Sequence, residues 1–322
     1  MSRLMRIVFM GTGEIALPSL RLLLKDSPDR ELVGAYTQPD KKIGRKQVVT
    51  PPEVKVLAEE AGIPVFQPLR FRDDEDALET LRDLNPDIIV VMAYGQILPR
   101  AVIEAPTIAC VNLHASLLPR HRGASPIQAA IREGDEESGI TLMRVVEKLD
   151  AGDIILKHVT AIRSDDTGGS LHDRLAELGP AVLEEGLPLL ASSSTQSIPQ
   201  DEALTTYAGK LEREDGRINW SQPAETIERL IRAYDPWPGT YLELEIRNRV
   251  KKCKIYPKCE AISESIGDPG TLRSDGKMLT VACRDSSLKL RGDLQLEGKK
   301  RLPVADFLRG TDLPAQISSR ND

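Results

Sequence analysis

The feature that most constrains this fold is the segment DIIVVMA over residues 87–93, in which the six residues after Asp87 are all apolar. A strand with one face in water alternates apolar and polar residues, and this segment does not, so it predicts a central strand buried on both faces. Around it, residues 1–192 alternate short apolar segments with amphipathic segments of helical period. That order predicts a doubly wound, mostly parallel α/β sheet of Rossmann-like type, covered by helices on both faces.

The pattern changes after the first two hundred residues. Residues 193–208 are polar and rich in turn-forming residues, which predicts a linker. Beyond one helical segment near 224–233, short alternating segments such as TYLELEI, KMLTVAC and SLKLRG dominate. They predict a smaller antiparallel C-terminal domain, a barrel or sandwich, and we expect an OB-like β-barrel. The expected organisation is an α/β domain over 1–192, a linker over 193–208 and a β domain over 209–322.

Composition narrows the function classes. The opening apolar segment is short and continues into a glycine turn, so we expect no leader, no membrane span and a cytoplasmic protein. The four cysteines lack the spacing of a zinc site, and we expect no metal. The net charge is −6, yet residues 209–322 hold 21 Lys/Arg against 18 Asp/Glu, so this part could face a polyanion.

The turn over residues 11–16, GTGEIA, follows a strand and opens a helix, as a dinucleotide-binding turn would. The acidic ribose partner is missing, because the next strand ends at Thr37 and Gln38, and Asp40 lies beyond it in a basic loop. We therefore interpret the glycines as a tight strand-to-helix turn, with NAD binding as the lesser alternative.

Asn112 and His114 form the strongest candidate site. Two residues apart in a strand, they share a face at its carboxyl end, where open α/β sheets bind ligands. Together they could hold the oxyanion of an acyl transfer, and Asp150, in the turn LDAGD, could orient His114. The alternative is structural: a turn cap, a satisfied strand-end histidine and a loop cap. Cys110 shares the strand parity but has no adjacent base, so a cysteine nucleophile is a minor alternative.

Several blocks of sequence resemble the methionyl-tRNA formyltransferase family, and they occur in family order over residues 5–242. They are MRIVFMGTGEIALPSL, TQPDKKIGRK, VMAYGQILP, VNLHASLLPRHRGASPIQAAI, GITLMRVVEKLDAGDII and INWSQPAETIERLIRAYDPWPGTY. The combination of NxH, SLLP and LDxGD is typical of folate-dependent formyltransferases, and IRAYDPWPGTY of members with a C-terminal domain. Gly13 departs from the family, which usually has proline there.

The resemblance implies the chemistry and its residues. Asn112, His114 and Asp150 match the catalytic set, and 10-formyltetrahydrofolate would be the formyl donor, with tetrahydrofolate released. Oxyanion stabilisation and proton relay near neutral pH suit these residue types. An apolar slot with backbone groups suits a flat pterin. The residues implied to hold the folate are Ser116, Leu117, Leu118 and Pro119, with the backbone around Tyr94, Gly95, Gln96, Ile97 and Leu98.

Initiator tRNA carrying methionine would be the acceptor, and the expected enzyme is a monomer. Cations on a loop after the second strand and on a hairpin of the C-terminal domain suit phosphate contact, although either could be mere solvated surface. The implied tRNA-binding residues are Lys41, Lys42, Arg45 and Lys46, then Lys210, and then Arg247, Arg249, Lys251, Lys252 and Lys254.

The nearest alternative is a folate-dependent formyltransferase acting on an amino sugar nucleotide, which would keep the same three catalytic residues. The basic loop and hairpin favour tRNA instead. A glycinamide ribonucleotide formyltransferase, a formylfolate hydrolase and a non-catalytic tRNA-binding protein are more distant alternatives.

Overall fold

The computed structural model describes residues 3–44, 46–192 and 196–317, which form two compact units. The first takes the described residues of 1–126, 137–160 and 172–208, and the second those of 127–136, 161–171 and 209–322. Each unit has its own hydrophobic core.

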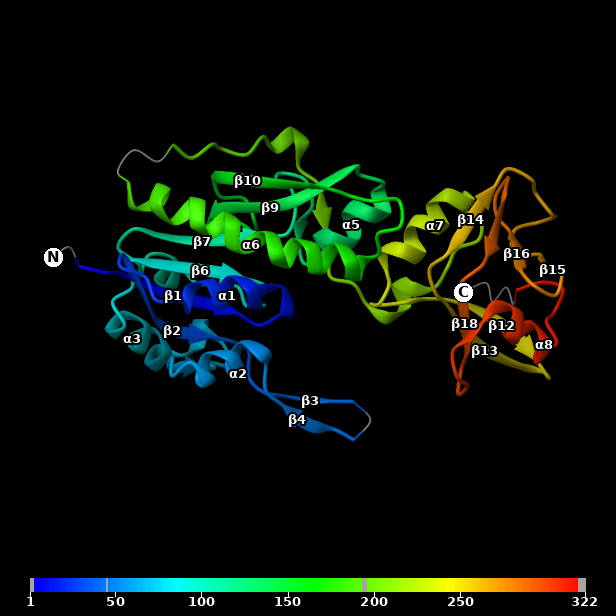
Figure 1. Ribbon diagram of the computed structural model, residues 1–322, viewed down its shortest axis with the longest axis horizontal. Coiled ribbons are helices and arrows are strands. Elements are labelled where there is room, and N and C mark those ends of the chain that lie inside the picture. The colour runs from blue at the N-terminus through cyan, green and yellow to red at the C-terminus, as the bar shows by residue number, and fades with distance from the viewer. Residues whose placement is uncertain (1–2, 45, 193–195, 318–322) are drawn as a thin grey trace. The chain divides into compact units, whose positions relative to one another are not determined.

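The first unit is built on a sheet whose order, within the described residues, is β10-β9-β7-β6-β1-β2-β5 (Figure 1). The strands β5, β2, β1, β6 and β7 are parallel, and β9 runs antiparallel to β7. Their bounds are β1 Met5–Gly11, β2 Arg30–Tyr36, β5 Val65–Phe66, β6 Ile88–Met92, β7 Ala109–His114, β9 Glu137–Arg144 and β10 Ile154–Ala161.

All five residues of β6 are buried, which places the apolar segment at the centre of the sheet, as its composition predicts. Residues of alternate parity face opposite helical layers. Ile89 and Val91 pack with Leu81 of α3 and Val102 of α4 on one face. On the other face Gly179 of α6 approaches the Met92 side chain, and α6 runs along the sheet beside α1 (Figure 1). Helices on both faces confirm the doubly wound, mostly parallel prediction.

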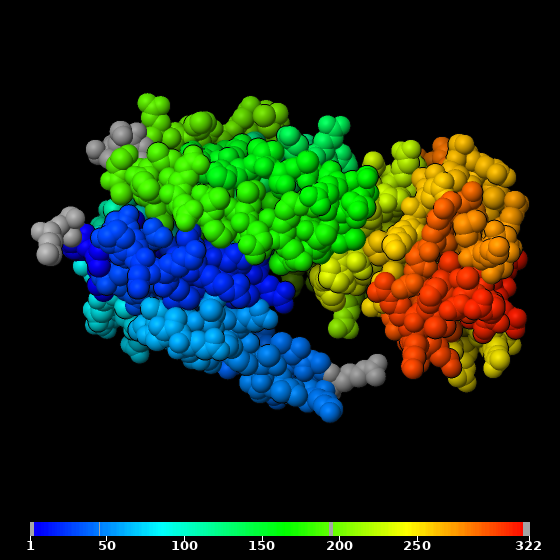
Figure 2. All heavy atoms as spheres, viewed as in Figure 1, coloured from blue at the N-terminus to red at the C-terminus, as the bar shows by residue number. Residues whose placement is uncertain are grey.

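The helices and short elements of the first two hundred residues are η1 Glu14–Ala16, α1 Leu17–Leu23, α2 Glu53–Glu60, η2 Phe71–Asp73, α3 Glu75–Asp83, α4 Arg100–Ile103, α5 Pro126–Glu133 and α6 Gly168–Ala191. The basic segment expected to be a loop is instead a hairpin of β3 Lys41–Ile43 and β4 Val48–Thr50, which projects from the first unit (Figure 2). Gly44 and Gln47 in its turn have left-handed φ angles of 70° and 50°. Two further short strands, β8 Arg122–Gly123 and β11 Tyr207–Ala208, pair in parallel.

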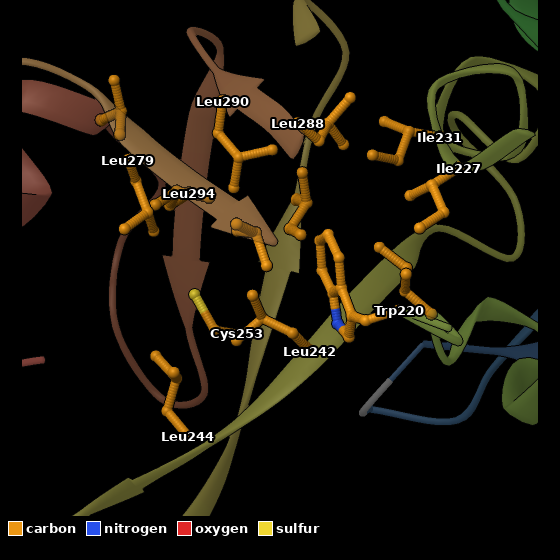
Figure 3. Close-up of a cluster of buried hydrophobic side chains, with 14 of the residues drawn as sticks. Trp220, Ile227, Ile231, Leu242, Leu244, Cys253, Leu279, Leu288, Leu290 and Leu294 are labelled. Atoms are coloured by element: carbon orange, nitrogen blue, oxygen red, sulfur yellow. The ribbon is translucent and has the colours of Figure 1, made fainter. Parts of the chain in front are cut away.

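The second unit contains two antiparallel sheets, of order β12-β13-β18-β19 and β14-β17-β16-β15 in the described part of the chain. They surround one core in which Trp220 and helix α7 pack against leucines of both sheets (Figure 3). This confirms the predicted smaller domain of antiparallel strands. Its bounds are η4 Arg213–Gly216, α7 Ala224–Ala233, β12 Thr240–Ile246, β13 Arg249–Ile255, β14 Cys259–Ile262, β15 Leu272–Ser274, β16 Leu279–Ala282, β17 Ser287–Leu290, β18 Asp293–Leu296, β19 Leu302–Pro303 and α8 Val304–Arg309, whereas η3 Glu202–Leu204 belongs to the first unit.

Candidate active site

Strand β7 carries Asn112 and His114 to the carboxyl end of the sheet. It lies between β6 and β9, with Asn112 opposite Val91 on one side and Met143 on the other. Asn112 is half-buried, and no hydrogen-bonding partner of its side-chain amide occurs among the residues that the structure describes. A half-buried amide at a sheet edge without a protein partner is available to a ligand.

The His114 ring is buried, with only 6% exposure, and its two nitrogens have different surroundings. Nε2 lies 2.9 Å from the carbonyl oxygen of His121, which can only accept, so Nε2 carries a proton and donates it. Nδ1 faces Oδ2 of Asp150 at 3.7 Å, beyond hydrogen-bonding distance. Nδ1 is therefore the ring nitrogen left for a reacting group, with a carboxylate beside it.

Asp150 is held in a strained position in the turn between β9 and β10. Its φ of 48° is left-handed, and its Oδ2 accepts a hydrogen bond of 2.8 Å from the Gly123 backbone N–H. Two residues on, a Cβ at Gly152 would lie 1.9 Å from the Arg144 carbonyl oxygen. The turn therefore needs glycine at position 152 because the backbone of β9 passes too close for any side chain.

Cys110 lies two residues before Asn112 and is 5% exposed. Burial raises the pKa of its thiol to about 12, so the thiol is neutral near pH 7 and cannot act as a nucleophile. The cysteine alternative therefore has no support in the site.

The glycine turn after β1 is explained by packing. A Cβ at Gly11 would lie 2.8 Å from the Phe9 ring and 3.0 Å from the Met92 carbonyl oxygen. The turn is also tied to the next loop, because Thr12 donates through Oγ1 to the Tyr94 carbonyl oxygen at 3.0 Å. These contacts favour the tight-turn interpretation over a dinucleotide site.

In the loop after β6, some side chains predicted to bind folate are instead buried or hydrogen-bonded within the protein. The Gln96 amide donates to the Pro68 carbonyl oxygen at 2.9 Å and accepts from the Phe71 N–H at 3.2 Å. Tyr94 and Leu98 are buried in the core, and burial raises the pKa of Tyr94 well above its usual range. Gly95, with φ of 82°, and Ile97, 74% exposed, remain open to a ligand.

The loop after β7 contains the other predicted folate-binding residues. Ser116 is buried, and its hydroxyl donates to the Arg120 carbonyl oxygen at 2.7 Å. The Leu118 N–H donates to Oγ1 of Thr141 on β9 at 3.2 Å. Leu117 and Pro119 are half-buried. Hydrogen bonds within the loop and to β9 thus fix it, and of its apolar side chains Leu118 is fully buried whereas Leu117 and Pro119 are partly exposed.

The cations proposed for tRNA lie on three segments. Lys41, Lys42 and Lys46 are exposed on the β3–β4 hairpin, Arg45 lies outside the described residues, and Lys210 is exposed just after β11. The hairpin also exposes apolar side chains, since Ile43, Val48 and Val49 are each more than half exposed. A two-stranded projection with cations and apolar residues could contact phosphates and bases.

The cations of the β12–β13 hairpin do not share one face. Register places Lys252 opposite Glu243 and Lys254 opposite Tyr241, whereas Lys251 is opposite Leu244 on the other face. Arg249 shares the Lys251 face, and Arg247 lies in the turn with a φ of 53°. Lys252 is also bonded to Glu214 at 3.1 Å and to the Tyr241 hydroxyl at 3.1 Å. The strand cations of this hairpin are therefore divided between two faces, and Lys252 is partly neutralised.

Sequence reasoning missed two residues next to the site. Arg122 is fully buried, and Gln200 comes from the segment predicted to be a linker. Gln200 donates through Nε2 to the carbonyl oxygens of Asp150 and Gly152, at 2.8 and 2.7 Å, and accepts from Arg122 Nε at 3.0 Å. The available signal was the short polar run around Gln200, but no local pattern links it to a turn fifty residues earlier.

A mostly parallel sheet followed by a domain of antiparallel strands is the fold of a formyl transferase. Residues 5–187 match the family described as formyl transferase, and residues 210–312 match formyl transferase, C-terminal domain. Curated relatives named methionyl-tRNA formyltransferase include those of Akkermansia muciniphila, 51% identical, and Pseudomonas putida, 50% identical. These matches cover 95% and 94% of this chain and 96% and 95% of the relatives. The chain belongs to the methionyl-tRNA formyltransferase family.

Among solved structures, the sugar 3N-formyl transferase WlaRD, crystallised with dTDP and 5-N-formyl-THF, superposes with a TM-score of 0.65 at 21% identity. That match covers 93% of this chain and 100% of WlaRD, and at this identity it shows the shared fold. Within the described residues no helix is long and apolar enough to cross a membrane. Nor do three or more His, Cys, Asp or Glu side chains gather there as a metal site would require.

Proposed function

We propose that this chain transfers the formyl group of 10-formyltetrahydrofolate to the amino group of methionine carried by initiator tRNA. The observation that supports the proposal is that His114 Nδ1 faces Asp150 Oδ2 at 3.7 Å, with Asn112 two residues earlier on the same strand, in a chain of this family. Formyl donors derived from folate fit the family, and the full-length relatives are named for a tRNA acceptor.

The proposed chemistry follows from what each side chain can offer. The neutral amine attacks the formyl carbon, and negative charge develops on the formyl oxygen. The free Asn112 amide and a protonated Nδ1 of His114 stabilise that oxygen, since Nε2 is already used by the His121 carbonyl. The Asp150 carboxylate, 3.7 Å from Nδ1, stabilises the charged ring. As the new C–N bond forms, the bond between the formyl carbon and the folate nitrogen breaks, and the proton that the amine loses passes to that nitrogen, which leaves as tetrahydrofolate.

The folate is proposed to lie against two loops at the same sheet edge. Ser116, Leu117, Leu118 and Pro119 line one side. The backbone of residues 94–98 reads the pterin edge on the other. The internal bonds of Gln96 and the burial of Tyr94 support a backbone role there, because these side chains are not available.

The tRNA is proposed to contact the β3–β4 hairpin through Lys41, Lys42 and Lys46, together with Lys210. Of the C-terminal hairpin, Arg247, Arg249, Lys251 and Lys254 remain the better candidates, because Lys252 is bonded to Glu214. We also propose the organisation 1–192, 193–208 and 209–322, and a monomer acting in the cytoplasm where charged tRNA is formed.

A panel of acceptors tests the proposed substrate. The wild-type enzyme is given 10-formyltetrahydrofolate with methionyl initiator tRNA, methionyl elongator tRNA or an amino sugar nucleotide. Formylation of the initiator tRNA alone, or much faster than of the other two, is expected. Formylation of only the sugar nucleotide would retain the catalytic residues and contradict the tRNA assignment.

A further inference from the structure

Residues 197–208, here called the strap, pack along the turn that carries Asp150. Ile198 and Ile154 exchange reciprocal backbone hydrogen bonds, each of 2.8 Å. The Ser197 hydroxyl donates to Asp153 at 3.1 Å. A segment whose composition predicts a linker thus adds an ordered backbone pairing at the start of β10.

The strap also binds the loop that holds His114. Thr206 accepts a 2.9 Å hydrogen bond from the His121 N–H, and its carbonyl oxygen accepts one of 2.9 Å from the Arg122 N–H. His121 has a left-handed φ of 59°, and its carbonyl oxygen is the acceptor for Nε2 of His114. The strap therefore touches the supports of both His114 and Asp150.

Gln200 of the strap links the Asp150 turn to the buried side chain of Arg122. It donates to the carbonyl oxygens of Asp150 and Gly152, while its own oxygen accepts from Arg122 Nε and Nη2 at 3.0 and 2.9 Å. Arg122 has no exposed side-chain surface and is also paired with Glu202 at 3.0 Å. A fully buried guanidinium seldom moves, because it cannot lose its partners without a large desolvation cost.

Asp150 needs such an anchor. A left-handed backbone is unfavourable for a residue other than glycine and persists only where surrounding contacts hold it. The Asp150 carboxylate accepts a hydrogen bond from the Gly123 N–H, and the Asp150 backbone carbonyl oxygen accepts one from the Gln200 side chain. Both contacts depend on the strap. Gln200 is part of it, and Gly123 lies in β8, which pairs with β11 at the end of the strap.

We propose that Gln200 is a positioning residue for the formyl transfer: anchored on buried Arg122, it fixes the Asp150 turn so that the carboxylate faces Nδ1 of His114. The proposal rests on the proposed function, because it assigns Asp150 its role there. The Gln200 amide is already bonded to protein groups through both its nitrogen and its oxygen, so the proposed role is exerted through the Asp150 turn.

Gln200→Glu separates its two contacts. A glutamate side chain has the same length and can still accept hydrogen bonds from Arg122. It has no N–H group, however, so its second oxygen would face the carbonyl oxygens of Asp150 and Gly152 without a hydrogen bond. We expect kcat to fall about 10- to 100-fold, as for a misplacement of about 1 Å. The KM values for folate and tRNA should change less than threefold. Gln200→Ala should behave alike, and Ser197→Ala, which removes a strap bond away from Asp150, should leave kcat within about twofold.

A double-mutant cycle shows whether Gln200 acts through Asp150. In an Asp150→Asn background, Gln200→Ala should cost less than twofold, because the group being positioned is already gone. An equal loss in both backgrounds would overturn the proposal, as would an unchanged kcat in Gln200→Glu.

The NMR signals of the His114 ring provide a measurement that needs no formyl-acceptor substrate. The chain has four histidines, so each ring can be followed by NMR. Gln200→Ala and Asp150→Asn should both change the chemical shifts of the His114 ring at a fixed pH, because the carboxylate oxygen would no longer lie 3.7 Å from Nδ1. The His158 and His172 signals, which face Glu185 and Asp173, should not change. If wild type fails to formylate tRNA, this shift still decides the positioning role, and its absence would refute it.

Discussion

Alanine at position 152 would place its Cβ 1.9 Å from the Arg144 carbonyl oxygen and 2.8 Å from the carbonyl carbon. To reach ordinary contact at 3.4 Å, the turn and β9 must separate by about 1.5 Å. The separation strains two bonds, one from the Arg144 N–H to the Asp153 oxygen at 2.9 Å and one from Gln200 to the Gly152 oxygen at 2.7 Å.

The expected cost in free energy of unfolding is about 2 to 3 kcal/mol, the range of an overpacked site that also loses hydrogen bonds. For a unit of this size that corresponds to a fall in Tm of roughly 4 to 12 °C. Asp150 lies two residues away, so a shift of about 1 Å should also lower kcat by about 100-fold.

Thermal unfolding and formyl transfer at saturating substrates measure the two effects. Gly209→Ala is the matched control, because a Cβ there meets nothing within 4 Å, and it should lower neither Tm nor kcat. If Gly152→Ala unfolds and reacts like wild type, the close approach of turn and strand is not the reason for glycine in this motif.

Three further changes test separate parts of the structure. Gly13→Ala should raise the free energy of unfolding by about 0.4 to 1 kcal/mol, because its φ of −74° suits alanine and the new Cβ meets Ala93 at 3.5 Å; a lower Tm would contradict this. Burial would raise the pKa of Asp87, but hydrogen bonds from the Arg6 amide, Thr107 and Arg3 outweigh it and lower that pKa. Its stabilisation is therefore present above the unfolded pKa of 3.8 and lost as pH falls through the folded value, so acid denaturation should be less steep in Asp87→Asn than in wild type; equal slopes would refute that linkage. Replacing Lys41 and Lys42 by alanine should reduce the slope of log kcat/KM against log salt by about 0.7 to 0.9 for each tRNA phosphate that these lysines neutralise, and an unchanged slope would remove the hairpin from the tRNA site.

Local patterns were sufficient to predict the main strands and helices, but not the β3–β4 hairpin or the short elements η3 and β11 in the predicted linker. The apolar segment became the fully buried β6, and the helical period near 224–233 became α7 over Ala224–Ala233. The parity of β7 likewise placed Asn112 and His114 together, because side chains in a strand alternate with fixed period.

Contacts between distant segments could not be predicted in this way. Gln200 reaches Asp150 across fifty residues, and neither segment carries a period that indicates the pairing. The cations of the β12–β13 hairpin look continuous in the sequence, yet strand alternation divides Lys251 from Lys252. Likewise nothing local shows that the Gln96 side chain bonds to the loop at residues 68–71 rather than to a ligand.

The most direct test of the proposed site is the single-turnover rate of formyl transfer to methionyl initiator tRNA in Asn112→Ala and His114→Ala. His158→Ala is the control, because His158 also pairs with a carboxylate, Glu185, at 2.8 Å, but outside the site. Losses of about 100- to 1000-fold in the first two variants, with an unchanged control and unchanged Tm, are the expected result. A rate within about threefold of wild type in His114→Ala would contradict the assignment of the site.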